Sequence, residues 1–299
     1  MPARLPAPII ITGGRGCLAG VVARHFAAGG APVSRYSRTG GGEFRALSDL
    51  LAPTAPPPAG TVLHLAWSTL PYSAEQATGD AAAPDLALLE QLLRRCAAAP
   101  TPPHFVFFSS GGTVYGNARD GRPSREEDPC EPVGRHGRAK LAAEQLVQRH
   151  AREHGLPCTI LRISNPYGFP LPSGRPQGII PVAVNCARSG QPLTVWGDGT
   201  ARKDFLHYTD FNRALEQIVA RRLTGLFNVS HGHSHTLREL LDLIERATGA
   251  RLQTRHVPPH AWDVHDSLLD NAKLRAALDW SPSVPLAEGI ARTAKELAS

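Results

Sequence analysis

The sequence lacks long apolar runs, a cysteine framework and any excess of acidic residues. No segment reaches the roughly 18–20 uninterrupted apolar residues that a membrane helix requires, and the run 9–11 is too short for a signal peptide. The five cysteines are an odd number, are widely spaced, and form no Cys-x-x-Cys or Cys/His set typical of zinc ligands. We therefore expect a cytoplasmic protein with no metal centre and no membrane association.

The composition is that of an ordinary globular protein with a sizeable core. The 299 residues are 42% hydrophobic and 19% charged, and 32 Lys and Arg against 26 Asp and Glu leave a net charge of +6. Such a balance favours anionic partners, nucleotides first. Because the chain has no block of like charges and no aromatic stacking platform, we expect no nucleic-acid partner.

Short apolar segments alternate with amphipathic ones along most of the chain. Runs typical of buried strands occur at 8–11, 31–34, 60–66, 105–108, 158–163 and 226–229. Helical spacing occurs at 85–95, 140–152, 210–222 and 237–248. This alternation predicts the α/β class, a doubly wound parallel sheet of the Rossmann type, with a smaller C-terminal α/β substrate-binding region.

The composition of the sequence changes after residue 164. Residues 1–164 are predicted to form a dinucleotide-binding domain, to which 204–230 returns. Residues 165–203 and 231–299 are predicted to form the substrate-binding region. Because 165–203 is rich in Pro and Gly, we expect this stretch to be built on loops with one helical piece.

The segment Thr12–Ala19 follows a predicted strand directly and opens a helix. Gly13 and Gly16 allow a tight turn and a close approach of backbone N–H groups to a pyrophosphate at the helix N-terminus. Ala19 stands where a third glycine serves helix packing, and the dinucleotide pattern accepts Ala there. A purely structural turn is the alternative.

NAD-binding folds place Asp or Glu at the end of the second strand, where the carboxylate accepts hydrogen bonds from the ribose hydroxyls. Here residues 34–38 contain Arg35 and Arg38, and no carboxylate precedes Glu43. Together with Arg15 in the glycine loop, these cations suit a 2′-phosphate. We expect NADP as the cofactor, with NAD as the second choice; a solvated surface charge is the alternative for each arginine.

The sequence resembles the extended short-chain dehydrogenase/reductase family of nucleotide-sugar epimerases, dehydratases and ketoreductases. The similar segments span nearly the whole chain in family order: TGGRGCLA at 12–19, HLAW at 64–67, FSSGGTVYG at 108–116, PVGRHGRAKLAAE at 132–144, LRISNPYG at 161–168, WGDGTARKDF at 196–205 and LDWSP at 278–282. In the cofactor domain, the resemblance adds Ala66 to the cofactor-binding residues.

The resemblance also implies the catalytic positions. Lys140 matches the lysine that holds the nicotinamide ribose, but His136 stands where the family has its acid/base tyrosine, and Gly111 stands where it has Ser or Thr. Thr113 offers a hydroxyl two residues further on. An imidazole can serve as the acid/base, and the charge of Lys140 would keep it neutral. The catalytic candidates are Thr113, His136 and Lys140; packing alone is the alternative for His136.

On the substrate side the resemblance implies contacts to a nucleoside-diphosphate sugar. Asn165 matches the asparagine at the diphosphate, and Ile179 lies in a segment that resembles the backbone clasp around the base. Lys203 stands where the family usually has Arg and can neutralise a phosphate. Surface charge alone is the alternative for the cations.

Three functions remain open. The first expectation is an NADP(H)-dependent oxidoreductase that reduces a 4-keto nucleotide sugar, because a loop that reads a 2′-phosphate suits a cofactor that enters reduced and leaves oxidised. The alternatives are a nucleotide-sugar 4-epimerase or dehydratase with tightly bound NAD, and a catalytically silent binding protein. The family often pairs two helices per subunit, and the apolar surface of 84–96 and 138–152 predicts a homodimer.

Overall fold

The computed structural model describes residues 8–118, 121–169 and 178–297. The chain divides into two compact units. Unit 1 comprises Met1–Ser110, Gly134–Arg162 and Asn212–Phe227, and unit 2 comprises Gly111–Val133, Ile163–Phe211 and Asn228–Ser299. Within the described ranges, no helix combines the length and the apolarity that crossing a membrane requires.

Unit 1 is built on a seven-stranded sheet in the order β10-β6-β5-β4-β1-β2-β3. The strands are β1 (Ile9–Thr12), β2 (Val33–Ser37), β3 (Phe44–Ala46), β4 (Thr61–His64), β5 (His104–Ser110), β6 (Cys158–Ile163) and β10 (Gly225–Val229). The register of β1 with β2 and β4, of β2 with β3 and of β4 with β5 is parallel. The predicted doubly wound parallel sheet is confirmed.

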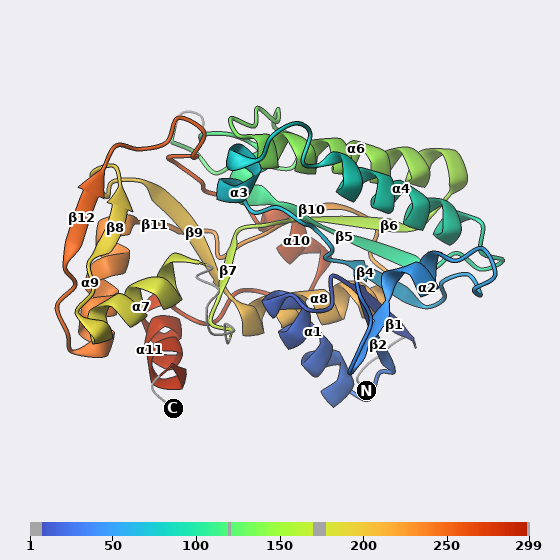
Figure 1. The fold of residues 1–299 in the computed structure, drawn as a ribbon, viewed down its shortest axis with the longest axis horizontal. Helices are drawn as coiled ribbons and strands as arrows, with labels where there is room; N and C mark the ends of the chain where they lie inside the picture. Colours follow the sequence, from blue (N-terminus) through green and yellow to red (C-terminus); the bar gives the residue numbers. More distant parts are fainter. Residues whose placement is uncertain (1–7, 119–120, 170–177, 298–299) are drawn as a thin grey trace. The chain divides into compact units, whose positions relative to one another are not determined.

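Helices cover both faces of this sheet (Figure 1). They are α1 (Cys17–Ala28), α2 (Leu47–Leu51), α3 (Pro71–Gln76), α4 (Ala83–Ala97), α6 (Arg135–His154) and α8 (Tyr208–Arg221), whose first four residues belong to unit 2. Helices α4 and α6 lie side by side on one face, and α1 and α8 lie on the other.

The face under α4 and α6 follows from the two-residue period of the strands. Ile10, Val62 and Phe105 are aligned across β1, β4 and β5, so their side chains share this face. The helices cover it with apolar residues at helical spacing: Leu89, Leu92 and Leu93 from α4, and Ala143 and Val147 from α6. Because all of them are buried, this side of the sheet is the core on which α6 is fixed.

Unit 2 contains two small sheets instead of the loops predicted for 165–203. Strands β11 (Ser234–Thr236), β9 (Arg202–His207) and β7 (Asn165–Tyr167) form one sheet, and β12 (Thr254–Val257) pairs with β8 (Leu193–Trp196) in the other. The predicted helical piece is confirmed by the helix Ile179–Ser189. The prediction of loops was wrong for β7, β8 and the start of β9, because these short strands pair with each other or with strands distant in the sequence. Residues 170–177 of that stretch lie outside the described residues.

The helices of unit 2 are α5 (Gly111–Val114), α7 (Ile179–Ser189), α9 (Leu237–Thr248), α10 (Ala272–Ala277) and α11 (Leu286–Glu296). Helices α7, α9 and α11 share an apolar cluster that includes Ile180, Leu240 and Ile290. All three side chains are fully or almost fully buried, so these helices form the core of the unit.

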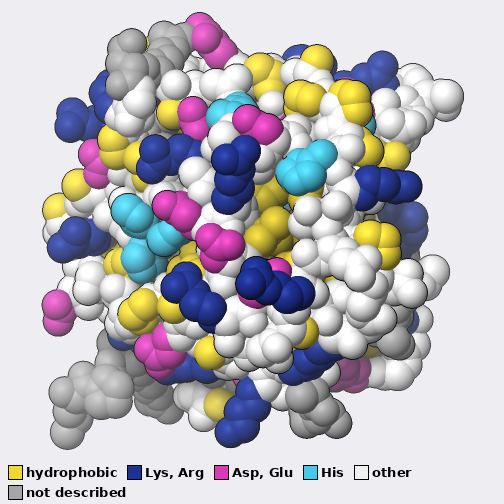
Figure 2. All heavy atoms as spheres, turned by 90° about the vertical axis from the view of Figure 1, so that its left-hand side faces the viewer, with side chains coloured by type: hydrophobic (Ala, Val, Ile, Leu, Met, Phe, Trp, Pro, Cys, Tyr) yellow, Lys and Arg dark blue, Asp and Glu magenta, His cyan; other side chains and the backbone are white. Residues whose placement is uncertain are grey.

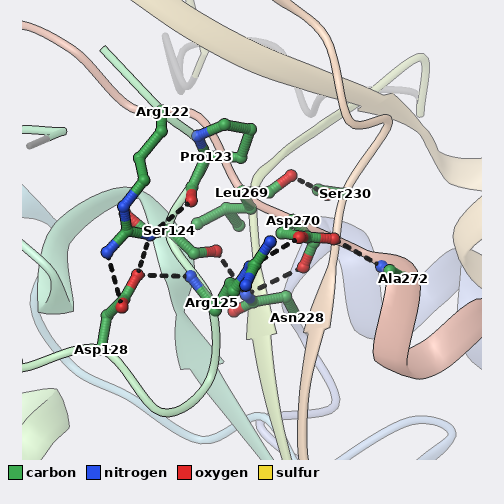
Figure 3. A network of polar contacts seen from close by, with 10 residues as sticks. All are labelled: Arg122, Pro123, Ser124, Arg125, Asp128, Asn228, Ser230, Leu269, Asp270 and Ala272. Atoms are coloured by element: carbon green, nitrogen blue, oxygen red, sulfur yellow. Dashed lines mark hydrogen bonds and ion pairs between the residues drawn. The ribbon is translucent and has the colours of Figure 1, made fainter. Parts of the chain in front are cut away.

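A polar network in unit 2 joins segment 122–128 to segment 268–272 (Figure 3). The Arg122 guanidinium donates to both carboxylate oxygens of Asp128, at 2.8 and 2.9 Å, and together with the Arg125 backbone N–H it lowers the pKa of Asp128 to about 2. The Asn228 amide donates to the carbonyl oxygens of Ser124 and Asp270, at 2.9 and 3.0 Å. The network therefore ties two irregular segments to the end of β10.

A buried ion pair links α6 to the sheet of unit 1. Arg162 on β6 donates through Nη2 to Glu144 Oε2 at 2.7 Å, and the Ser109 hydroxyl donates to Oε1 of the same carboxylate at 2.5 Å. Glu144 is 1% exposed and Arg162 is 4% exposed. Removal of the carboxylate alone would leave a buried guanidinium without its counter-ion.

We expect Glu144→Ala to lower the free energy of unfolding by about 3–5 kcal/mol, because it strands the Arg162 charge in the core. Urea denaturation of both proteins measures the difference. Arg94→Ala is the matched control: it breaks the exposed pair with Glu90 on α4, which should cost at most about 0.5 kcal/mol. Equal losses in the two variants would contradict a structural role for the buried pair.

Candidate functional site

The glycine loop connects β1 to α1 in unit 1. Gly13 has φ +72°, and a Cβ added there would lie 2.7 Å from the Ala66 nitrogen, so this glycine brings the loop against the segment after β4. The Gly16 N–H donates to the Gly13 oxygen at 2.9 Å, and Gly16 is the N-cap of α1. The structure thus brings together three of the predicted cofactor-binding residues, Gly13, Gly16 and Ala66.

The N-terminus of α1 has the properties of an anion site. No side chain caps the helix, and its first turn contains no acidic residue. Backbone N–H groups in the first turn of a helix have no intrahelical acceptor and, with the helix dipole, favour a phosphate. The glycine turn and the uncapped helix N-terminus therefore have the properties that a pyrophosphate site requires.

The three predicted arginines lie beside this loop in different environments. Arg35 donates through Nε and Nη2 to the Gly14 oxygen, and through Nη1 to Glu43 Oε1 at 2.8 Å. Arg15 donates to the Ser37 hydroxyl at 3.2 Å. Arg38 is exposed. Glu43, from the turn before β3, is thus the carboxylate that pairs with Arg35.

Lys140 on α6 is buried at the end of β5. Its ammonium donates to the Phe108 oxygen at 2.9 Å and lies 4.0 Å from the centre of the Trp67 ring. Burial lowers the pKa of Lys140 to about 7, although the charges of Asp85 and Glu144 oppose this shift. The lysine is therefore held by a carbonyl and an indole face, with its charge only partly balanced by carboxylates.

His136 lies one helical turn before Lys140 and is 8% exposed. Its ring hydrogen-bonds the Thr69 backbone, and the donor is Nε2, since Nδ1 is buried without a partner among the described residues. Burial, and then the charge of Lys140, lower the pKa of His136 to about 4. The imidazole is consequently neutral at pH 7, with a fixed tautomer whose acceptor nitrogen is Nδ1.

A second buried histidine lies under the same site. His64 at the end of β4 hydrogen-bonds the Thr12 hydroxyl through Nδ1 at 2.8 Å and stacks with Phe105 and Phe107. Burial and the Lys140 charge lower the pKa of His64 to about 3. This ring is neutral and serves as a polar link between β4 and the start of the glycine loop.

Three side chains hold the segment Ala66–Thr69 from both sides. The Lys140 ammonium lies over the Trp67 ring, and the His136 ring hydrogen-bonds the Thr69 backbone. The buried Asp85 carboxylate accepts hydrogen bonds from the Ser68 backbone N–H at 2.9 Å and from its hydroxyl at 2.8 Å. Lys140 and His136, the two candidate catalytic residues of α6, therefore also hold the segment against which the glycine loop packs.

In unit 2, Gly112 is close to the predicted substrate residue Asn165: a Cβ added to Gly112 would lie 4.0 Å from the Asn165 amide atoms and 3.7 Å from Ser267 Oγ. Asn165 donates to the Asp204 oxygen at 2.8 Å. The Thr113 hydroxyl is buried without a partner among the described residues. The Thr113 hydroxyl is therefore unsatisfied and buried, and nothing around it in the described ranges exposes it to a ligand.

The other two predicted substrate residues lie on separate elements of unit 2. Ile179 is the first residue of α7, after Gly178 with φ 86°. Lys203 on β9 donates to Asp263 Oδ1 at 3.1 Å and to the Val264 oxygen. The Lys203 charge is therefore already paired with a half-exposed carboxylate.

Histidines gather among charged side chains on one face of unit 2 (Figure 2). Within 178–297, the His233 and His235 rings lie 4.7 Å apart, and His260 stacks on Trp262 at 4.5 Å. Across the described ranges, no three His, Cys, Asp or Glu side chains come together as metal ligands.

Comparison with known proteins adds to this geometry. Residues 9–230 match the model of the NAD dependent epimerase/dehydratase family. The chain belongs to this family. The resemblance to extended short-chain dehydrogenases/reductases is thereby confirmed.

The chain is similar to the UDP-glucose 4-epimerase of Mycolicibacterium smegmatis, with 31% identity over 63% of this chain and 60% of the relative. It is similar to the dTDP-4-dehydro-6-deoxyglucose reductase of Escherichia coli, with 30% identity over 64% of this chain and 60% of the relative. It thus spans about 60% of the length of these curated relatives. The fold matches the Thermus thermophilus UDP-glucose 4-epimerase in complex with NAD, with a TM-score of 0.86, 24% identity and coverage of 97% and 99% of the two chains.

Sequence reasoning missed four residues that shape the cofactor side. Glu43 and Phe44 lie beyond the end of the second strand, and neither Asp85, in the predicted helix 85–95, nor Trp67, in the similar segment HLAW, was assigned a role. A signal existed for Trp67, which stands in HLAW directly beside the predicted cofactor residue Ala66. No sequence signal connects Asp85 to Ser68.

We expect the His136 ring to stay neutral down to about pH 5, because burial and the Lys140 charge both disfavour the imidazolium. Histidine ring signals followed by NMR from pH 8 to 4.5 measure this, with His136→Phe to assign the signal. A His136 signal that titrates near its ordinary value of about 6.5 would refute the neutral, fixed tautomer.

Proposed function

We propose that the protein is an NAD(P)-dependent epimerase of nucleoside-diphosphate sugars, in which His136 exchanges the proton of the sugar hydroxyl. The observation that carries this proposal is the fixed neutral imidazole beside a buried lysine. Family membership and similarity to a UDP-glucose 4-epimerase support it.

His136 is unprotonated at pH 7, as a proton acceptor must be, although its lowered pKa also makes it a weaker base than a free imidazole. Its Nε2–H is committed to the Thr69 backbone, whereas Nδ1 has no partner among the described residues and is buried, so a hydroxyl reaches it only after a local movement. With a pKa of about 4, roughly one ring in a thousand is protonated at pH 7. A reaction that begins with removal of a proton from a hydroxyl therefore fits this site.

This order of events favours the epimerase over the reductase that was expected first. Reduction of a 4-keto sugar taken up from solution needs a proton from the enzyme as the hydride arrives, and at pH 7 the imidazole almost never carries one. Epimerisation begins with removal of the hydroxyl proton, and the same proton then returns to the same oxygen. Because burial and Lys140 destabilise the imidazolium, His136 would give the proton back readily.

Dehydration of a nucleotide sugar requires more acid and base groups than the segment Gly111–Gly116 provides. Elimination of water from a keto sugar needs an acid and a base at neighbouring carbons, in addition to the group at the C4 oxygen. The segment Gly111–Gly116 offers two hydroxyls, of Thr113 and of Tyr115, and no carboxylate, and the Tyr115 hydroxyl already donates to Asn228. Epimerisation needs only the single proton exchange.

We assign the remaining roles as follows. A bound dinucleotide would accept and return a hydride. Gly13 and Gly16 would bind its pyrophosphate, and Lys140 would hold the nicotinamide ribose with the donors that Phe108 leaves free. In unit 2, Asn165 would bind the diphosphate. That Thr113, Ile179 and Lys203 contact the sugar nucleotide stays a prediction.

Turnover tests this assignment. We expect the protein with NAD⁺ to interconvert the C4 epimers of a UDP- or dTDP-hexose, followed by proton NMR of the sugar. His136→Phe should lower the rate at least 100-fold by removing the proton acceptor, whereas His136→Tyr should retain activity because a phenol can exchange the same proton. Both variants lose the Thr69 hydrogen bond, so NAD⁺ affinity and melting temperature are measured for each, and only a loss of rate at saturating NAD⁺ is ascribed to proton exchange.

Other products distinguish the alternatives. Consumption of NADPH with a 4-keto sugar would favour the reductase, and a 4-keto-6-deoxy product would favour the dehydratase. Binding of a nucleotide sugar without any turnover would overturn the enzyme proposal in favour of a silent binding protein.

We also propose a homodimer formed through α4 and α6. These helices lie side by side on one face of unit 1, and Leu88, Leu141 and Leu146 are only partly buried there. Light scattering at micromolar concentration should give twice the 32.0 kDa of one chain. Leu88→Glu should yield the monomer mass while the far-UV spectrum is unchanged; a wild-type monomer would refute the dimer.

A further inference from the structure

The Arg35–Glu43 ion pair lies where the adenosine ribose of a dinucleotide would meet the end of β2. We propose that Glu43 determines the choice between dinucleotides with and without a 2′-phosphate, by occupying Arg35 and by supplying the carboxylate that β2 lacks. This inference rests on the dinucleotide site of the proposed function.

The guanidinium of Arg35 is held in one orientation. Nε and Nη2 both donate to the Gly14 oxygen, which leaves Nη1 to donate to Glu43 Oε1 at 2.8 Å. The Phe44 ring lies 4.4 Å from the Arg35 guanidinium carbon and stacks with it. The Gly14 oxygen and the Phe44 ring fix the guanidinium, so only Nη1 can bind an anion. Glu43 already accepts a hydrogen bond from Nη1.

A 2′-phosphate and the Glu43 carboxylate would compete for the same cation. A phosphate on Nη1 would have to displace the carboxylate or lie beside it, and two anions at that distance repel each other. A ribose with a free 2′-hydroxyl has the opposite relation, since the hydroxyl can donate to the carboxylate. Glu43 therefore disfavours NADP and favours NAD at a strand end that carries arginine.

The other two arginines do not remove this competition. Arg15 donates to the Ser37 hydroxyl and to the Thr39 and Gly40 oxygens, and its guanidinium carbon also lies 4.4 Å from the Phe44 ring. Arg38 is exposed. A 2′-phosphate placed between Arg35 and Arg15, which both lie against Phe44, would still face the carboxylate.

The Glu43 side chain is 67% exposed, so its charge can be removed without opening a cavity. We expect Glu43→Gln to tighten NADP⁺ binding at least tenfold and to leave NAD⁺ binding equal or weaker. Calorimetric titration of the nucleotide-stripped protein with each dinucleotide gives both dissociation constants, and the melting temperature should be unchanged.

Glu288→Gln is the matched control, because it removes the same charge from an exposed Glu–Arg pair on α11 of unit 2. It should change neither dissociation constant. The double variant Glu43→Gln/Arg35→Ala should lose the gain in NADP⁺ affinity, because that gain requires the freed guanidinium.

The outcomes separate this inference from the proposed function. If wild-type protein binds a dinucleotide but Glu43→Gln leaves the ratio of the two constants unchanged, the role of Glu43 is refuted and the proposed function stands. If the wild-type protein binds neither dinucleotide, the proposed function itself is refuted. An equal tightening of NADP⁺ binding in Glu288→Gln would show a general charge effect and would also refute the role of Glu43.

Discussion

The segment Ala66–Thr69 determines the geometry of the cofactor side, because three buried groups hold it and the glycine loop packs on it. Asp85 binds Ser68 through two hydrogen bonds, and Lys140 and His136 bind its neighbours. Each of these polar groups would be costly to bury alone. Asp85 and His136 bond the segment itself, while Lys140 lies over the Trp67 ring, so α6 and the segment are linked through His136 and Lys140.

The sequence was sufficient for the features that local patterns encode. Ile9–Ile11 followed by Thr12–Ala19 predicts strand, turn and helix, because buried parallel strands and glycine turns have strong local signatures. The predicted loops at 165–203 failed for the opposite reason. Strands of three or four residues, such as β7 and β8, have too few positions to show a period and are stabilised by partners far along the chain.

The cofactor residues show the same limit. The sequence shows Arg35 at a strand end. It does not show that Arg35 pairs with Glu43 and stacks on Phe44, because a turn brings these residues, eight and nine positions later, back to Arg35. His136 was expected to be neutral because of Lys140, and the structure gives burial as the larger cause. Spacing along a helix reveals a neighbouring charge, whereas burial depends on how the whole unit packs.

The two ends of the proposed dinucleotide site support one kind of chemistry. His136 is neutral and disfavours the protonated form, so it suits a proton that leaves and returns within one turnover. Glu43 pairs with Arg35, so the site suits a cofactor without a 2′-phosphate. A reaction that takes a hydride from a sugar and returns it to the same sugar needs no exchange of cofactor, and therefore no selection for the reduced phosphorylated form. The His136 imidazole and the Glu43 carboxylate, on separate elements of unit 1, thus favour the same internal cycle.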